Sequence, residues 1–114
     1  MKDFKNQITL TLVKRDKETY NLEDLNKKII EKLTDAFHHV LILQAEKTSS
    51  INGELQNREV LLVNCNFNDL TEGMKEAVQE AIILEMTEGK EDVVELKVNN
   101  ETQLLYKENY IENN

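Results

Sequence analysis

Residues 40–67 have the sequence VLILQAEKTSSINGELQNREVLLVNCNF, in which two apolar segments flank a polar stretch with Asn52-Gly53 at its centre. Asn and Gly tolerate positive φ, as a two-residue hairpin turn requires. The pattern predicts a short buried strand over 40–45 and a second strand over 60–67. The polar residues 46–58 are then expected to form a protruding ribbon or a mobile loop.

The register of this hairpin follows from its apolar faces. If Ile51 pairs with Glu54 around the turn, Ile42 lies opposite Val63 and the apolar faces of the two strands coincide. A slip of one residue would place the apolar residues on opposite faces of the sheet. The sequence therefore predicts a single register.

Two amphipathic helices are predicted on either side of the hairpin. Apolar residues recur at spacings of three and four over 22–38, and Asn21 offers a side-chain oxygen as N-cap. The second helix is expected to begin at Asp69, with Glu72 as its capping-box partner, and to end in a left-handed cap at Gly89.

The remaining segments are predicted to be strands. Residues 8–13 alternate apolar side chains with Thr, the period of a half-buried strand. Residues 93–98 and 102–106 are expected to form a closing hairpin with a three-residue loop, which sets Leu96 against Leu104.

These elements predict an α+β fold. The order β-α-β-β-α-β, with an extra C-terminal strand, is that of the ferredoxin-like split β-α-β plait. Right-handed crossovers would place both helices on one face of a mostly antiparallel sheet. We expect one domain over residues 1–106 and a frayed C-terminal tail over 107–114.

Charge is distributed unevenly along the 114 residues. The formal net charge is −8, and residues 58–114, with 13 acids and 5 bases, carry all of the excess. Nucleic acids and anionic membranes are bound through clusters of Lys and Arg, so neither is an expected partner. An acidic surface suits a basic protein surface instead. The absence of an apolar leader and the single cysteine predict a cytoplasmic protein.

Sequence motifs for catalysis or cofactor binding are missing. The three glycines are far apart and form no phosphate-binding loop. Cys65 lies in an apolar strand pattern, which favours core packing over nucleophilic chemistry. No cofactor is therefore expected, and the chain is predicted not to be an enzyme.

Asp35, His38 and His39 are the weak candidates for metal ligands. Their spacing at the end of the first helix could place a carboxylate and an imidazole on one face. A competent site needs further ligands, and none is marked elsewhere. Histidines in a last turn also interact with free helix carbonyls, and that interpretation predicts no metal.

Two segments are candidates for binding a partner. Glu72, Glu76 and Glu80 follow each other at i, i+4 on the outer face of the second helix, where like charges cost a few tenths of a kcal/mol per pair. The second candidate is the long polar segment between the strands, because long loops in compact domains are often functional. Its candidate residues are Lys47, Ile51, Asn52, Leu55 and Arg58.

The leading hypothesis is a small acidic protein-binding module, such as an inhibitor or accessory factor from a phage or bacterial mobile element. The layout of residues 8–106, with a large loop between the second and third strands, resembles the PII-type signalling proteins. That resemblance implies a trimer that binds nucleotides and partner proteins through the loop, and hence a small-molecule or nucleotide sensor. A self-assembling structural subunit, buried at its sheet edges by copies of itself, is the third hypothesis.

Overall fold

The computed structural model describes residues 4–15 and 23–111. The elements in chain order are β1 (Asn6–Val13), α1 (Glu23–Phe37), β2 (Val40–Ile51), β3 (Glu54–Phe67), α2 (Glu72–Thr87), β4 (Val93–Val98), β5 (Glu101–Tyr106) and α3 (Lys107–Tyr110). The N-cap predicted at Asn21 lies outside the described residues. No helix within the described ranges is long and apolar enough to cross a membrane.

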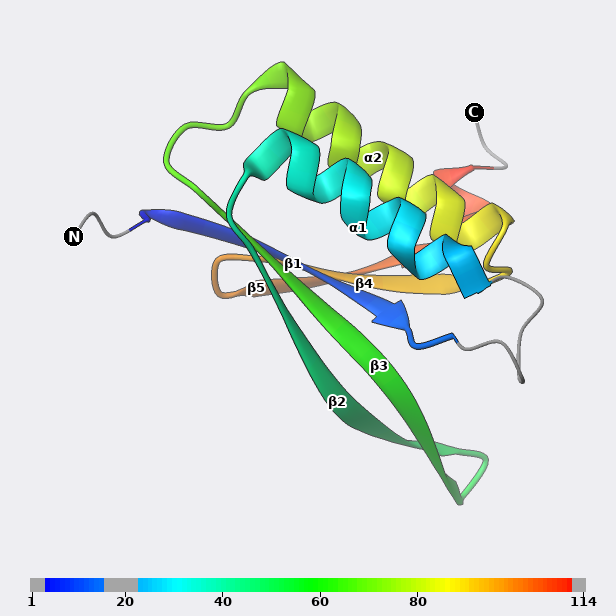
Figure 1. Cartoon of the computed structure of the whole chain (residues 1–114). Coiled ribbons are helices and arrows are strands. Elements are labelled where there is room, and N and C mark those ends of the chain that lie inside the picture. Colours follow the sequence, from blue (N-terminus) through cyan, green and yellow to red (C-terminus); the bar gives the residue numbers. More distant parts are fainter. Residues whose placement is uncertain (1–3, 16–22, 112–114) are drawn as a thin grey trace.

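The predicted fold class is confirmed. The five strands form one antiparallel sheet in the order β2-β3-β1-β4-β5, which contains the ferredoxin-like arrangement with β5 added at one edge. Both long helices lie on the same face of this sheet (Figure 1). The core forms where alternate strand residues meet the apolar helix faces. Its most deeply buried members include Leu10, Leu12, Ile29, Leu33, Val63, Ile82 and Met86.

The register predicted for the β2–β3 hairpin is also confirmed. Ile51 pairs with Glu54, and Ile42 lies opposite Val63. Positive φ values of 54° and 81° at Asn52 and Gly53 close the turn. Residues 46–58 are therefore the distal half of a continuous two-stranded ribbon that projects from the body (Figure 1).

The prediction that residues 40–45 form a buried strand is wrong in its length and its burial. The strand extends to Ile51, and Leu41, Ile42 and Leu43 are 55%, 41% and 45% exposed. β2 is an edge strand, and its Leu41 and Leu43 lie on the face that carries no helix. A run of apolar residues did not distinguish burial inside the sheet from exposure at its edge.

The closing hairpin differs from its prediction by one residue. The turn contains two residues, Asn99 and Asn100, so Leu96 pairs with Gln103 rather than with Leu104. Asn99 adopts φ 55°, and its backbone and side chain bond Gln7 on β1. These contacts stabilise the shorter turn. Because β5 is an edge strand, its apolar side chains need not all point toward the core.

Both predicted ends of α2 also need correction. The N-cap is Thr71, whose hydroxyl accepts a bond from the Met74 backbone N–H at 3.1 Å, so neither Asp69 nor Glu72 has the predicted capping role. At the other end the left-handed residue is Lys90, with φ 57°, and not Gly89. Near the C-terminus, where a frayed tail was expected, residues 107–110 form α3.

Candidate functional site

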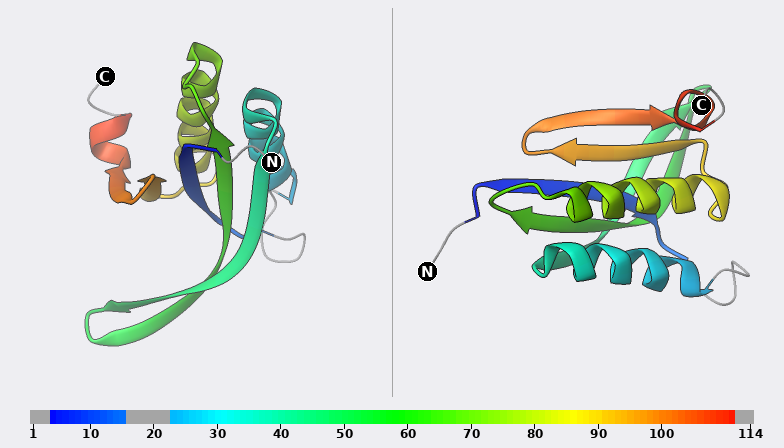
Figure 2. Two further views of the ribbon diagram at one scale, coloured as in Figure 1. Left: turned by 90° about the vertical axis from the view of Figure 1, so that its left-hand side faces the viewer. Right: turned by 90° about the horizontal axis from the view of Figure 1, so that it is seen from above.

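A groove opens where the sheet extends beyond its helices. β5 lies outside the edge of α2 in the view from above (Figure 2, right), so the helix-side face of β4 and β5 is only partly covered. The resulting groove has a volume of about 340 Å³. Its apolar lining comes from both layers and includes Val78, Ile82, Leu96 and Leu105. The two-residue turn of the β4–β5 hairpin places Leu105 and Gln103 on this side.

Polar side chains stand among these apolar residues. Gln79 and Lys75 of α2, Gln103 of β5 and Tyr110 of α3 line the groove. Burial raises the pKa of the Tyr110 phenol above its ordinary value. Gln79 and Tyr110 also border an adjoining hollow beside α3. An apolar groove with a few amide and phenol groups is typical of a small-ligand site.

The predicted partner-binding ribbon divides into a fixed base and an exposed tip. Arg58 bonds Glu91 at 2.8 Å, and Lys47 lies 3.8 Å from Glu95, so both cations hold the ribbon against the start of β4. At the tip, Leu55 is 77% exposed and Ile51 is 48% exposed. Asn52 forms the turn between them. All five predicted ribbon residues are exposed, and at the tip two of them are apolar.

The three glutamates of α2 do not form a uniformly unpaired acidic face. Glu72 pairs with Lys75 at 3.1 Å, and Glu80 pairs with Lys32 of α1 at 3.2 Å. Glu76 is exposed and has no ion pair within the described ranges. Lys75 and Lys32, which pair with Glu72 and Glu80, reduce the repulsion among the three glutamates that the i, i+4 spacing would otherwise cause.

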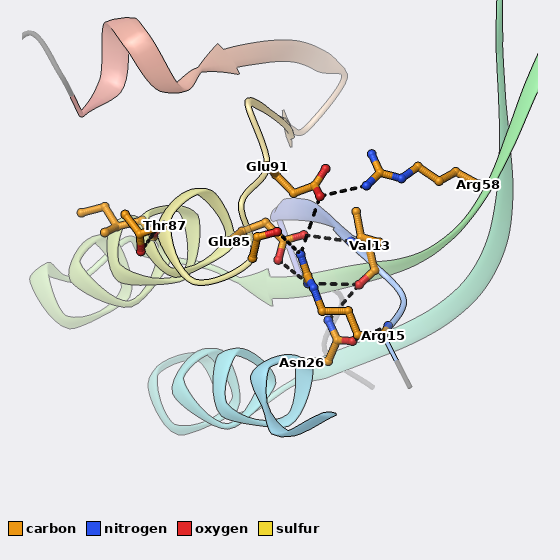
Figure 3. A network of polar contacts seen from close by, with 9 residues as sticks. Val13, Arg15, Asn26, Arg58, Glu85, Thr87 and Glu91 are labelled. Carbon is orange, nitrogen blue, oxygen red and sulfur yellow. Dashed lines mark hydrogen bonds and ion pairs between the residues drawn. The ribbon is translucent and has the colours of Figure 1, made fainter. Parts of the chain in front are cut away.

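A buried ionic network joins four segments of the fold (Figure 3). Nη1 of Arg15 donates to Oε1 of Glu85 at 2.6 Å, and Oε2 of the same carboxylate accepts the Val13 N–H at 2.8 Å. Asn26 of α1 accepts the Arg15 N–H and donates to the Val13 carbonyl. Glu91 links this network to the ribbon, since it pairs with Arg58 and lies 3.9 Å from Nη2 of Arg15.

This buried network supports the fold. The Arg15 and Glu85 side chains are 0% and 1% exposed, so no substrate reaches them. Burial raises the pKa of the Glu85 carboxyl, and the Arg15 bond opposes that rise. The sequence carried a signal for the site that we did not interpret: Glu85 and Asn26 occupy apolar-face positions of their helices. A polar residue there needs a buried partner.

The remaining candidates occupy structural positions. His38 adopts φ 66° and bonds the Thr34 carbonyl where α1 ends, while the ring of His39 lies 4.8 Å from that of Phe4. No cluster of three or more metal-ligating side chains, with Asp35 or otherwise, occurs within the described residues. Cys65 is fully buried, which raises the pKa of its thiol to about 12.

Comparison with known proteins identifies similar folds. No protein-family model and no curated protein sequence matches the chain. A structure of a phage SAM lyase in complex with S-methyl-5′-thioadenosine matches with a TM-score of 0.54 and 11% identity over 90% of both chains. A phage SAM lyase in the apo state matches with a TM-score of 0.53 and 17% identity, over 89% of this chain and 86% of that one. At these identities the likeness shows a common fold.

Proposed function

We propose that the chain binds a small adenosine-containing compound of the S-adenosylmethionine class in the groove between α2 and β5. The observation that carries this proposal is the groove itself. Its volume of about 340 Å³ lies within the range of small-ligand sites, and its lining is mainly apolar with two amides, one phenol and the Lys75 ammonium. The fold likeness to phage SAM lyases supports the choice of ligand class.

The groove chemistry suits such a ligand in three respects. Leu105 and Ile82 offer an apolar surface for the thioether or the flat base. Gln79 and Gln103 each provide an amide donor and acceptor for the edge of adenine. The net charge of −8 attracts S-adenosylmethionine, a sulfonium cation, and raises its local concentration.

Calorimetry with S-adenosylmethionine and with S-methyl-5′-thioadenosine tests this proposal. The variant Leu105→Trp fills the groove, whereas Leu104→Trp adds the same bulk on the opposite face of the same strand. We expect the wild type and Leu104→Trp to bind, and Leu105→Trp to lose at least tenfold in affinity. Absence of binding by the wild type, or equal binding by both variants, would reject the groove.

A turnover assay addresses catalysis separately. The protein is incubated with S-adenosylmethionine, and S-methyl-5′-thioadenosine is measured by chromatography against a heat-denatured control. Because the sequence carries no recognised catalytic motif, we expect no product. Product formed by the wild type and by Leu104→Trp, but not by Leu105→Trp, would show instead that the chain is an enzyme.

A second function is favoured by the tip of the ribbon. We propose that the chain binds a partner protein with a basic surface. The candidate contacts are Ile51 and Leu55 at the tip and, on a separate surface, the exposed Glu76 of α2. Ile51 and Leu55 are both exposed at this protruding turn and project from opposite faces of the ribbon, since Ile51 lies opposite Glu54 and Leu55 opposite Ser50. The partner role expected from the sequence is that of an inhibitor or accessory factor in the cytoplasm.

Affinity capture from the native host tests the second function. The double variant Ile51→Ser and Leu55→Ser should lose the partner, and Glu76→Lys should weaken its capture most at low salt. Leu104→Ser, with a similarly exposed leucine, is the matched control. Equal recovery of all proteins with the wild type and the double variant would rule out the tip as a binding surface.

A further inference from the structure

We propose that two copies of this chain associate through the outer edge of β2, in antiparallel register about Ile42. This inference goes beyond both proposed functions. The β2 edge is the sheet edge opposite to β5, which lines the groove, and residues 40–45 are separate from the ribbon tip. It rests on three properties of residues 40–45: an unprotected edge, the direction of the free backbone groups and a self-complementary side-chain pattern.

The edge lacks the features that usually prevent strands from associating. Among the described strands β2 pairs with β3 alone, so its other edge presents N–H and C=O groups that bond no described strand. Natural edge strands are commonly protected by charges, prolines or bulges. Residues 40–45 contain none of these, and the pairing with β3 is regular through the whole segment.

The free backbone groups belong to the even-numbered residues. The Asn66 N–H donates to the His39 carbonyl at 3.0 Å, so His39 bonds toward β3. Bonded pairs alternate along an antiparallel ladder, and the odd-numbered residues of β2 therefore share this direction. Val40, Ile42 and Gln44 point their N–H and C=O groups outward, where a second strand can bond them.

The register about Ile42 satisfies both the backbone and the side chains. With Ile42 opposite Ile42 of the second copy, Val40 faces Gln44 and all outward groups find partners. Leu41 then lies opposite Leu43 of the second copy on the face without helices, while the two Ile42 side chains meet on the helix side. A shift of two residues toward the N-terminus would set Leu43 against His39, which precedes the strand.

These properties favour a second copy over an unrelated partner. The exposed leucines and isoleucine occupy both faces of the edge, and the two-fold pairing sets Ile42 against Ile42 and each Leu41 against Leu43 of the other copy. The chain carries a charge of −8, but residues 40–45 are uncharged. Two copies therefore meet at a segment that adds little like-charge repulsion.

Light scattering after size exclusion, over a dilution series, tests the association. We expect the wild type to show twice the 13.3 kDa chain mass and Ile42→Lys to dissociate at protein concentrations at least tenfold higher. Leu104→Lys, which alters a similarly exposed leucine at the other edge, should remain dimeric. A monomeric or trimeric wild type, or a dimer that is unaffected by Ile42→Lys, would overturn the proposal.

Disulfide trapping tests the register without relying on the lysine variant. In a Cys65→Ala background, Ile42→Cys places two thiols at bonded positions with Cα atoms about 5.5 Å apart, within reach of a disulfide. In Leu43→Cys the two thiols do not face each other, because position 43 lies opposite position 41 of the second copy. We expect oxidation to link the Ile42→Cys chains much faster. Equal linking of both variants, or none, would exclude this register, and circular dichroism verifies that each variant is folded.

Discussion

Arg15 and Glu85 form a buried ion pair of 2.6 Å although 70 residues separate them in the chain. Arg15 follows β1, and Glu85 lies near the C-terminal end of α2. Because Asn26 of α1 and Glu91 bond into the same network, the pair connects the sheet, both helices and the ribbon. The ion pair therefore lies at the junction of these segments.

Removing one partner should cost more than removing both. Arg15→Met or Glu85→Met leaves an uncompensated charge in a dry site, for which we expect a loss of about 3–5 kcal/mol in the free energy of unfolding. The double variant should lose clearly less than the sum of the two. Urea denaturation of the four proteins measures the coupling, and additive losses would show that the two side chains act independently.

Gly89 is predicted to be required because the Arg15 side chain packs closely against it, and not because of its backbone conformation. A Cβ at Gly89 would collide with the Arg15 guanidinium and the Glu85 carbonyl, whereas at Gly73 it would meet only Thr71 Oγ1 at 3.9 Å. We expect Gly89→Ala to destabilise the fold by about 1–3 kcal/mol. The control, Gly73→Ala, lies in the first turn of α2 and should be neutral or slightly stabilising in thermal unfolding.

The corrected N-cap of α2 gives a paired prediction. Thr71→Ala removes the hydroxyl that accepts the Met74 N–H and should lower the free energy of unfolding by about 1 kcal/mol. Asp69→Ala, which alters the cap expected from the sequence, should have little effect. The opposite ranking in chemical denaturation would restore Asp69 as the helix start.

Cys65 should make the protein less stable at alkaline pH. Its thiol pKa is about 12 in the fold and 9.0 ordinarily, so the unfolded chain loses this proton first. The stabilisation is fully present below pH 9 and is lost as the pH rises toward 12. At pH 10 the loss amounts to about 1.4 kcal/mol.

Comparison with Cys65→Ala isolates this contribution, because all other titrating groups are shared. The variant should have a lower free energy of unfolding at pH 7, owing to the smaller side chain, but a weaker decline between pH 9 and 11. Parallel declines in the two proteins would show that the thiol is not responsible.

Local patterns predicted the elements and the pairing of β2 with β3. Ile42 opposite Val63 followed from the Asn52-Gly53 turn, because a short turn and a buried face together permit one register. At the β4–β5 hairpin the same reasoning was wrong. β5 is an edge strand whose side chains are mostly exposed. The match of apolar side chains between β4 and β5 therefore did not determine the length of the turn.

The candidate partner-binding residues stay predictions, because no partner contact in the structure tests them. Ile51 and Leu55 lie exposed at the ribbon tip, whereas Lys47 and Arg58 of the same segment are bound to glutamates at and before the start of β4. The groove was not predicted, because it depends on how far two helices extend across five strands. No periodicity within one segment carries that information.

The sequence by itself determined the α+β class, the helix faces and the β2–β3 register, since each depends on residues close together in the chain. Only the tertiary structure decided that Glu85 would meet Arg15, that β2 would lie at an edge, and that β5 would extend beyond α2. These relationships join segments distant in the chain, and they depend on the packing of whole layers.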